Sequence, residues 1–207
     1  MSLSGGYFDR LYADSPDPWG FTDRWYEQRK RAVTLAALPA ERYACAYEPG
    51  CSVGVLTEAL ADRCDDLLAS DVAEQALAQA RARLAGREHV RLEQHALPGD
   101  WPAGSFDLVV LSEFLYYFND ADLAEVARLA VAAVSASGTL LAVHWLHPVE
   151  DYPQSGAHAQ EVVAAAATGL IRTVRHREAD FDLAVYVRPQ PGEDTARLSV
   201  AARQGLC

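Results

Sequence analysis

The sequence predicts an α/β fold: a doubly wound, mostly parallel seven-stranded sheet whose last strand pair is antiparallel. Two observations predict it. Between residues 43 and 147, short apolar runs alternate with amphipathic helical stretches, and no Pro/Gly/Ser-rich linker interrupts them. A glycine-containing turn follows the first apolar run, where such sheets bind ligands. Repeated strand-helix-strand units of this kind require a parallel sheet with helices on both faces.

The individual elements follow from the hydrophobic periodicity, in chain order. Thr22 is expected to cap a helix that runs to about Leu38, where Pro39 stops it. The runs typical of parallel strands are 44–47, 66–70, 90–93, 106–111 and 139–145. Helical spacing of Leu, Ala and charged residues predicts helices over 53–63, 73–85 and 122–134. We then expect a helix over 157–168 and an antiparallel strand pair over 170–180 and 183–188.

The length of 207 residues fits a single domain over 1–207, because one hydrophobic core usually serves about 100 to 200 residues. Within it, 7–40 is expected to form an N-terminal helical cap or lid, and 41–188 the strand-helix core. The tail over 189–207 has no firm signal of structure.

The charge balance restricts the partners. Eighteen Lys and Arg residues against 29 Asp and Glu give a net charge of −11, which disfavours nucleic acids and anionic membranes. Partners are expected to be small, neutral or cationic. No apolar run is long enough to span a bilayer and no secretion signal is evident, so we expect a cytoplasmic protein. The four cysteines contain no C-x-x-C pair, as expected of reduced thiols: Cys45, Cys51, Cys64 and Cys207.

The glycine turn spans 48–54, with Gly50 and Gly54 at its centre and end. Gly50 permits close approach of a ligand to the backbone, and Gly54 permits close helix packing. A dinucleotide fingerprint requires a further glycine where Ser52 stands, so that pyrophosphate can contact the backbone. Asp71 ends the second strand, 71 − 54 = 17 residues later, where an acid can accept hydrogen bonds from both ribose hydroxyls. These residues favour a mononucleoside ligand.

Together these features resemble a class I S-adenosylmethionine-dependent methyltransferase with its Rossmann-like core. The resemblance narrows to the nodulation protein S (NodS-like) family over four segments: Asp17-Pro18-Trp19, Trp25-Tyr26-Glu27-Gln28-Arg29-Lys30, Glu-Pro-Gly-Cys-Ser-Val-Gly-Val-Leu-Thr at 48–57, and Leu111-Ser112-Glu113-Phe114-Leu115-Tyr116-Tyr117. The resemblance in fold covers about 7–188. That family methylates the free amine of a terminal glucosamine in a chitooligosaccharide.

The resemblance implies S-adenosylmethionine as cofactor, with S-adenosylhomocysteine as product. Asp71 would hold the ribose, Val72 would lie along the adenine, and Glu48 would accept the cofactor's ammonium. Arg29 would pair with its carboxylate beneath a lid of aromatic residues, although these residues could instead pack the N-terminal helix on the sheet. The implied cofactor-binding residues are Trp19, Tyr26, Arg29, Glu48, Gly50, Cys51, Gly54, Asp71, Val72, His95, Ala96 and Ser112. His95 stands where many relatives carry an acid before Ala96, which leaves adenine recognition to His95, Gln94 or the backbone.

An amine must lose a proton before it attacks a methyl group, so a nearby proton acceptor is expected. Glu113, after the fourth strand, and His144, at the end of the fifth, are the catalytic candidates, with a capping acid and a packed imidazole as the structural alternatives. Tyr116, Tyr117 and His158 are expected to line the acceptor pocket. The stretch 152–158 resembles the family's acceptor segment, with Ala157 where an acid is often found.

We expect no metal, because the spacing His144-x-x-His147 in a loop is common by chance and Mg²⁺ seldom uses paired imidazoles. The leading function is methyl transfer to a small-molecule acceptor, with an amine on an amino sugar or oligosaccharide as the best interpretation, which would suit oligosaccharide biosynthesis. Small-molecule O-methylation is the alternative. A nucleoside-binding protein without catalysis and a nicotinamide-dependent oxidoreductase stay open as other classes, although Ser52 argues against the latter. The sequence does not indicate an oligomeric state.

Overall fold

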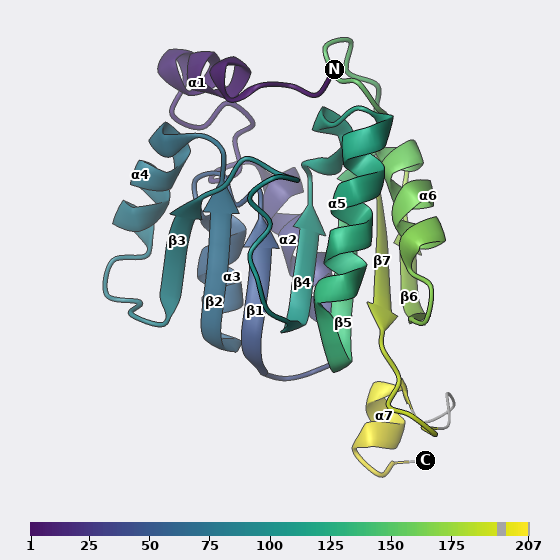
Figure 1. The fold of residues 1–207 in the computed structure, drawn as a ribbon. Helices are drawn as coiled ribbons and strands as arrows, with labels where there is room; N and C mark the ends of the chain where they lie inside the picture. The colour runs from purple at the N-terminus through teal and green to yellow at the C-terminus, as the bar shows by residue number, and fades with distance from the viewer. Residues whose placement is uncertain (194–197, 207) are drawn as a thin grey trace.

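The computed structural model describes residues 1–193 and 198–206. Its sheet has seven strands in the order β3-β2-β1-β4-β5-β7-β6, and only β7 runs antiparallel to its neighbours. The strands are β1 (Tyr43–Pro49), β2 (Cys64–Asp71), β3 (Val90–Gln94), β4 (Phe106–Ser112), β5 (Val134–Trp145), β6 (Ile171–Arg177) and β7 (Phe181–Val187). The helices are α1 (Gly5–Asp14), α2 (Trp25–Ala37), α3 (Val55–Ala61), α4 (Glu74–Arg83), η1 (Leu115–Tyr117), α5 (Asp120–Ala133), α6 (Gly156–Ala166) and α7 (Val200–Arg203). The predicted fold class, including the antiparallel last pair, is confirmed (Figure 1).

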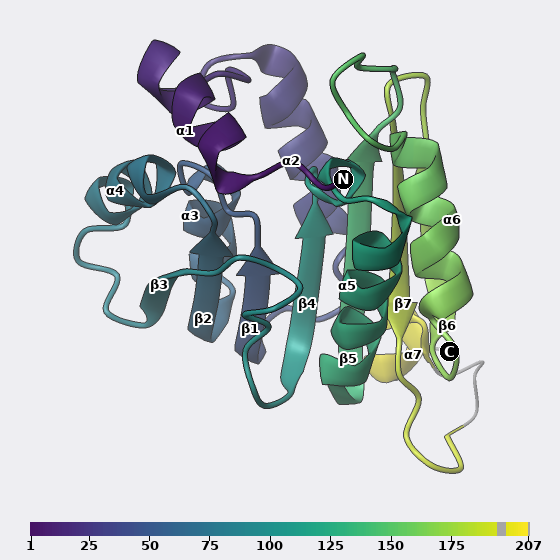
Figure 2. The same cartoon turned by 45° about the horizontal axis from the view of Figure 1, so that its top comes forward.

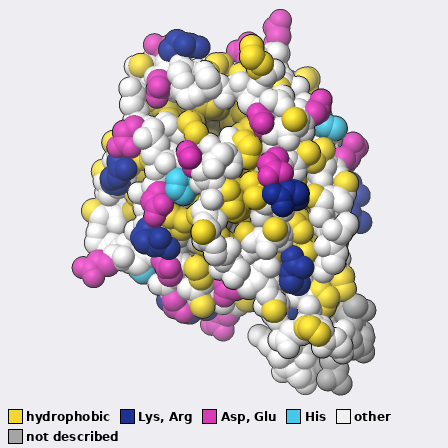
Figure 3. All heavy atoms as spheres, in the orientation of Figure 1, with side chains coloured by type: hydrophobic (Ala, Val, Ile, Leu, Met, Phe, Trp, Pro, Cys, Tyr) yellow, Lys and Arg dark blue, Asp and Glu magenta, His cyan; other side chains and the backbone are white. Residues whose placement is uncertain are grey.

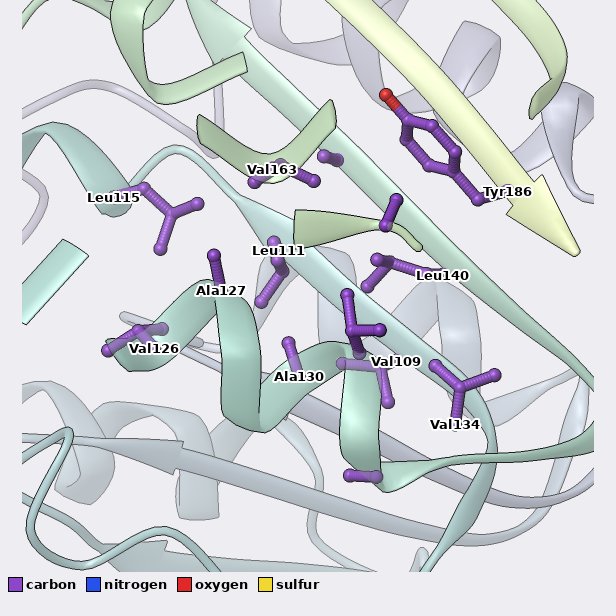
Figure 4. Packing of buried hydrophobic residues seen from close by; sticks show 14 of the residues in the cluster. Val109, Leu111, Leu115, Val126, Ala127, Ala130, Val134, Leu140, Val163 and Tyr186 are labelled. Atoms are coloured by element: carbon purple, nitrogen blue, oxygen red, sulfur yellow. The ribbon is translucent and has the colours of Figure 1, made fainter. Parts of the chain in front are cut away.

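The strands β4, β5 and β7 are apolar on both faces because helices cover both sides. Figure 4 shows one of these layers, in which α5 and α6 pack on the sheet through Val126, Ala130 and Val163 against Val109 and Leu140. The opposite layer joins α2 and α3 to the same strands. Burial on both faces accounts for the continuous apolar runs in the sequence.

The sheet is covered differently at β2 and β3. The chain from β3 to β4 crosses as a loop over 95–105, and no helix covers the front of these strands in the described part of the chain. Arg91 instead pairs there with Asp66 at 3.1 Å. Figure 3, in the same view, shows acidic and basic side chains spread over this side of the molecule around a hydrophobic centre.

Helix α1 lies at the upper end of the sheet, near the points where β1, β2 and β4 end, and α2 runs behind the sheet from that end (Figure 2). The N-cap of α2 is Arg24 and not Thr22, so the expected cap is wrong by two residues. The reason is local: the Asp17 carboxylate accepts hydrogen bonds from the backbone N–H groups of Phe21 at 3.0 Å and Thr22 at 2.9 Å. These bonds form a turn that occupies the amides a helix would use.

Other element boundaries differ from the predictions by a few residues. β5 begins at Val134 rather than 139, through an irregular register opposite Phe106. The turn between β6 and β7 is 178–180, whereas the predicted strands leave 181–182 for it. The short helix α7 lies in the tail, where no structure was predicted. Cys207 lies outside the described residues, and the other three cysteines are free thiols. Among the described helices, none has the length and apolar character that crossing a membrane requires.

Candidate functional site

A cavity of about 270 Å³ opens at the carboxyl ends of β1, β2 and β4. Helices α1 and α2 close it from above, together with the segment around Trp19 and Phe21. The carboxyl ends of parallel strands lie at the same edge of a sheet. Backbone turns and charged side chains that follow several strands therefore meet there. Of the residues predicted for the site, the following line it: Trp19, Glu48, Gly50, Cys51, Asp71, Val72, His95, Ala96, Ser112, Glu113 and Tyr117.

The glycine turn forms the floor of the cavity. Gly50 has φ +72°, and a Cβ added there would lie 2.9 Å from Cγ of Phe114. A side chain at position 50 would therefore displace the cavity wall. Ser52, which replaces the glycine of a dinucleotide fingerprint, has φ +51° and donates its N–H to Asp71. Gly54 precedes α3 and packs against Ala80 of α4, so close helix packing is observed at that position.

Asp71 connects the glycine turn to the end of β2. Its Oδ2 accepts the Ser52 N–H at 2.8 Å, and its Oδ1 accepts the Ala73 N–H at 2.9 Å. Burial raises the pKa of this carboxyl, and the backbone N–H groups oppose that rise. Each oxygen keeps a lone pair for a further donor. Asp71 is thus fixed in position at the cavity wall, as a pair of ribose hydroxyls would require.

Glu48 ends β1 in an apolar setting. The residue is 2% exposed, and its Oε2 has no hydrogen-bond partner among residues 1–193 and 198–206. Burial raises the pKa of Glu48 to about 8, and the negative charge of Asp71 adds to the rise. A buried carboxylate with a free oxygen is a suitable acceptor for an ammonium group, which is the role predicted for Glu48.

The helix α2 presents a charged face to the cavity at positions that the sequence analysis did not select. Glu27, Lys30, Arg31 and Thr34 line the cavity, at the spacing i, i+3, i+4 and i+7 of one helix face. Lys30 Nζ lies 2.9 Å from Oε2 of Glu27 and 2.9 Å from Oε1 of Glu113. Two carboxylates therefore share one ammonium inside the cavity.

Arg29 was expected to pair with the cofactor's carboxylate, but the structure places it elsewhere. It lies on the outer side of α2, where both guanidinium ends pair with Glu178 at 2.6 and 2.7 Å. Arg31 is the α2 arginine that lines the cavity, and its Nη1 donates to the Phe21 carbonyl at 3.3 Å. The correction follows from the helix rotation, since residues 29 and 31 differ by about 200° around the axis.

Glu113 follows β4 and lines the cavity with a strained backbone, φ +61°. Its Oε2 accepts the Tyr116 hydroxyl at 2.8 Å and the Trp145 N–H at 3.0 Å, while Oε1 faces Lys30. Burial opposes ionisation, but the Lys30 ammonium and these hydrogen bonds outweigh it and lower the pKa of Glu113. The carboxylate is thereby held ionised in one orientation.

His144 does not line the cavity. It is fully buried beneath the end of β5, and neither ring nitrogen has a hydrogen-bond partner in the part of the chain that the structure describes. Burial lowers the pKa of His144 to about 4, so the imidazole is neutral at pH 7. The His144 side chain has no access to the cavity, which the predicted catalytic role would require. The structure therefore favours the alternative, an imidazole that packs in the core.

Three further predicted residues lie outside the cavity wall. Tyr26, in the first turn of α2, packs against Trp145 with a distance of 5.2 Å between the ring centroids. The Tyr116 ring stacks on that of Tyr152 with a centroid distance of 5.1 Å, and its hydroxyl donates to Glu113 at the site. His158 lies on the first turn of α6, 3.3 Å from Asp120.

The loop over 146–155 carries Tyr152 to the rim of the site. The Tyr152 hydroxyl lies 3.3 Å from Nε1 of Trp19 and 3.5 Å from the hydroxyl of Tyr117. The loop ends at Gly156, where a Cβ would lie 1.8 Å from the Trp145 carbonyl oxygen, so no other residue fits without moving α6. Tyr117 and Tyr152 thus form an aromatic wall beside the cavity.

His95 and Ala96 lie at the adenine end predicted for the cavity. His95 Nδ1 is 3.4 Å from the Tyr47 hydroxyl and its Nε2 is 3.1 Å from Glu93. His147 pairs with Asp180 at 2.7 Å, away from His144. Within residues 1–193 and 198–206, no three His, Cys, Asp or Glu side chains converge as metal ligands.

The chain is similar in sequence and fold to known proteins. The sequence profile described as nodulation protein S (NodS) matches residues 9–178. Nodulation protein S of Rhizobium tropici is 34% identical over 116 residues, which cover 56% of this chain and 48% of that protein. The chain therefore spans about half the length of that relative.

Two solved structures extend the comparison. A candidate methyltransferase from Pseudomonas syringae is 45% identical, with 80% of this chain and 100% of that chain covered and a TM-score of 0.71. The N-methyltransferase NodS from Bradyrhizobium japonicum WM9, solved with S-adenosyl-L-homocysteine, is 23% identical, with 89% and 98% covered and a TM-score of 0.78. The fold predicted from the class I methyltransferase resemblance is confirmed.

Proposed function

This chain belongs to the nodulation protein S family, and we propose that it is an S-adenosylmethionine-dependent methyltransferase that methylates a free amine on a small acceptor, such as an amino sugar or its oligosaccharide. One observation carries the proposal: a single cavity joins the glycine turn and Asp71 at one end to the Glu27–Lys30–Glu113 cluster at the other. The first end suits a nucleoside with an amino acid tail. The second end, with two carboxylates and one ammonium, suits a cationic acceptor.

The residues present fit the cofactor. The free Oε2 of Glu48 matches an ammonium group, and the lone pairs of Asp71 match two ribose hydroxyls. Arg31 and Val72 line the same cavity and would meet the carboxylate and the adenine. When bound, S-adenosylmethionine supplies a methyl group from its sulfonium and leaves as S-adenosylhomocysteine.

The chain's own residues position the acceptor. Glu113 is held by Lys30, Tyr116 and the Trp145 N–H, so its carboxylate presents a fixed negative charge to an incoming ammonium group. Positioning supplies much of the rate, because the leaving group is already good. The aromatic wall of Tyr117 and Tyr152 would exclude water beside the reacting nitrogen. The cytoplasmic location and the single-domain boundaries stay predictions.

A panel of acceptors with isotope-labelled S-adenosylmethionine tests the proposal. Glucosamine oligomers are compared with their fully N-acetylated counterparts, and catechols and small carboxylic acids serve as controls. Incorporation into the free-amine oligomers alone is expected. Incorporation into only the hydroxyl or carboxyl controls would replace the amine with an O-methylation acceptor, and binding of NAD without S-adenosylhomocysteine would remove the methyltransferase assignment.

A further inference from the structure

The cavity contains the chain's single lysine. Of 18 Lys and Arg residues in the sequence, Lys30 is the one lysine, and the other 17 basic residues are arginines. Its side chain is 7% exposed and lies between Glu27 and Glu113, with 2.9 Å to each carboxylate. The lysine ammonium is a compact point charge with three donors, so it can bridge the two carboxylates.

The two carboxylates that share this ammonium are engaged to different extents. Glu113 has three partners, since Tyr116 and the Trp145 N–H occupy Oε2 and Lys30 faces Oε1. Glu27 pairs with Lys30 alone among the described residues, and it also lines the cavity. Glu27 therefore keeps lone pairs for a group that enters the cavity, while Glu113 is nearly saturated.

The surroundings separate the two acids electrostatically as well. The charged and titratable groups that face the cluster are Tyr26, Lys30 and Arg31 on α2, Tyr116 and Tyr117 on η1, and the neutral His144 on β5. Burial raises the pKa of Glu27 in spite of Lys30, while Lys30 and the hydrogen bonds lower that of Glu113. Paired acids whose pKa values are separated in this way commonly divide acid-base tasks.

We propose that Glu27 is a catalytic residue that accepts the proton the acceptor's ammonium must lose, while Lys30 positions Glu27 and keeps Glu113 as the fixed negative charge. This inference rests on the proposed function. The N–H bond of the ammonium breaks, its electron pair stays on nitrogen, and the proton forms an O–H bond on the Glu27 carboxylate. Glu27 later returns this proton to solvent, and the neutral amine is the nucleophile.

The pH dependence of methyl transfer by Glu27→Gln separates this role from a structural one. Below the pKa of the acceptor amine, the variant should be slower than wild type by about 10² to 10⁴ in kcat. The deficit should shrink as the pH rises through that pKa, because solvent then deprotonates the amine. A deficit that stays constant at every pH would overturn the proposal. Glu125→Gln, at an exposed pair with Arg128, is the matched control and should match wild type.

A second readout does not depend on activity. Because Lys30 is the one lysine, isotope-labelled lysine gives a single side-chain NMR signal, and its shift reports the carboxylates 2.9 Å away. We expect a titration step in wild type and Glu125→Gln that is lost in Glu27→Gln and is kept, at a changed pH, in Glu27→Asp. An unchanged step in Glu27→Gln would overturn the proposal even if that variant were too unstable for kinetics.

Different results would contradict the proposed function and the role of Glu27. Wild type without activity on any amine would remove the proposed function, and the role of Glu27 with it. Wild type active on amines, with Glu27→Gln equally active across the pH range, would remove only the role of Glu27. Affinity for S-adenosylhomocysteine, measured by calorimetry, should be the same in both proteins, because Glu27 is assigned to the acceptor.

Discussion

Glu48 lies near the end of β1, and Glu113 follows the neighbouring strand β4. Both line the same cavity, yet their surroundings are opposite. Glu113 meets an ammonium and two hydrogen-bond donors, which lower its pKa. Glu48 has an oxygen without a partner in the described chain, and burial raises its pKa to about 8. One end of the cavity is complete without a ligand, and the other end lacks a cation.

The difference indicates which interactions belong to the fold and which await a ligand. A buried charge that has its partners stabilises the fold only modestly, but removal of one partner is costly. A buried acid without partners destabilises the fold in the absence of ligand. Binding of a ligand cation removes this cost, which therefore contributes to the free energy of binding. We therefore expect changes at the Lys30 end to affect folding and changes at the Glu48 end to affect affinity.

The largest effect is expected for Lys30→Met. Loss of the ammonium leaves the buried carboxylates of Glu27 and Glu113 without their shared cation. The free energy of unfolding at pH 7 should therefore fall by about 3 to 5 kcal/mol. Urea unfolding measures this, and Lys30→Arg should recover part of the loss. A loss in Lys30→Met no larger than that in Arg128→Met, which breaks an exposed pair, would show that both cavity ends tolerate an unpaired charge.

Asp71→Ala should act on affinity and not on the fold. Two ribose hydroxyls would lose charge-assisted acceptors, so binding of S-adenosylhomocysteine should weaken by about 2 to 3 kcal/mol in calorimetry. The circular dichroism spectrum should stay that of wild type. An unchanged affinity would contradict the ribose assignment of Asp71.

Glu48→Gln should have effects of opposite sign on stability and binding. The folded pKa of about 8 exceeds the ordinary 4.5. Between these values the folded state holds a proton that the unfolded state has lost, so wild-type stability falls as the pH rises. The variant removes this slope, at most about 1.4 kcal/mol per pH unit, and should be the more stable protein at pH 8 without ligand. Its affinity for S-adenosylhomocysteine should fall.

Thermal unfolding of Glu48→Gln and wild type at pH 6 and pH 8 tests this. The same difference in stability at both pH values would contradict the raised pKa assigned to Glu48. In wild type, ligand affinity should also rise as the pH increases toward 8, because the ammonium requires the ionised carboxylate. Proton release on binding, measured in buffers of different ionisation enthalpy, checks this directly.

His144→Leu should have the smallest effect. The imidazole is neutral and lacks partners in the described chain, so an apolar replacement should change the free energy of unfolding at pH 7 by less than about 1 kcal/mol. The folded pKa of about 4 is below the ordinary 6.5, so wild type loses stability as the pH falls between these values, and the variant should not. A large loss of methyl transfer at neutral pH, with the fold intact, would restore the predicted catalytic part for His144.

The fold could be predicted almost completely because apolar periodicity reports which faces of an element are buried. Parallel strands such as β4 and β5 are buried on both faces and appear as continuous apolar runs. Asp71 and the glycine turn could also be placed, since strand ends converge at one edge of the sheet. The start of α2 could not, because it depends on the hydrogen bonds that the Asp17 carboxylate accepts from the Phe21 and Thr22 N–H groups.

The charged face of α2 was missed for a different reason. A motif gives residue types but not the rotation of a helix, so Arg29 was selected where Glu27, Lys30 and Arg31 line the cavity. The Arg29–Glu178 pair joins residues 149 positions apart and leaves no local signal. Two signals were nonetheless available: Lys30 is the one lysine, and positions 27, 30, 31 and 34 share one polar helix face.

Gly156 fixes one end of the loop over 146–155, because a Cβ there would collide with the Trp145 carbonyl oxygen. At the other end of the same loop, the Leu146 N–H donates to the Asp180 carbonyl at 2.8 Å, so backbone atoms and a missing side chain fix both ends. Between them, residues 147–151 are exposed and can vary without disturbing the sheet, whereas Tyr152 contacts Trp19 and Tyr117. Under the proposed function, we expect exchange of this segment to change acceptor preference and to leave the glycine turn and Asp71 in place. The same segment is therefore a practical unit for transplantation between homologous enzymes.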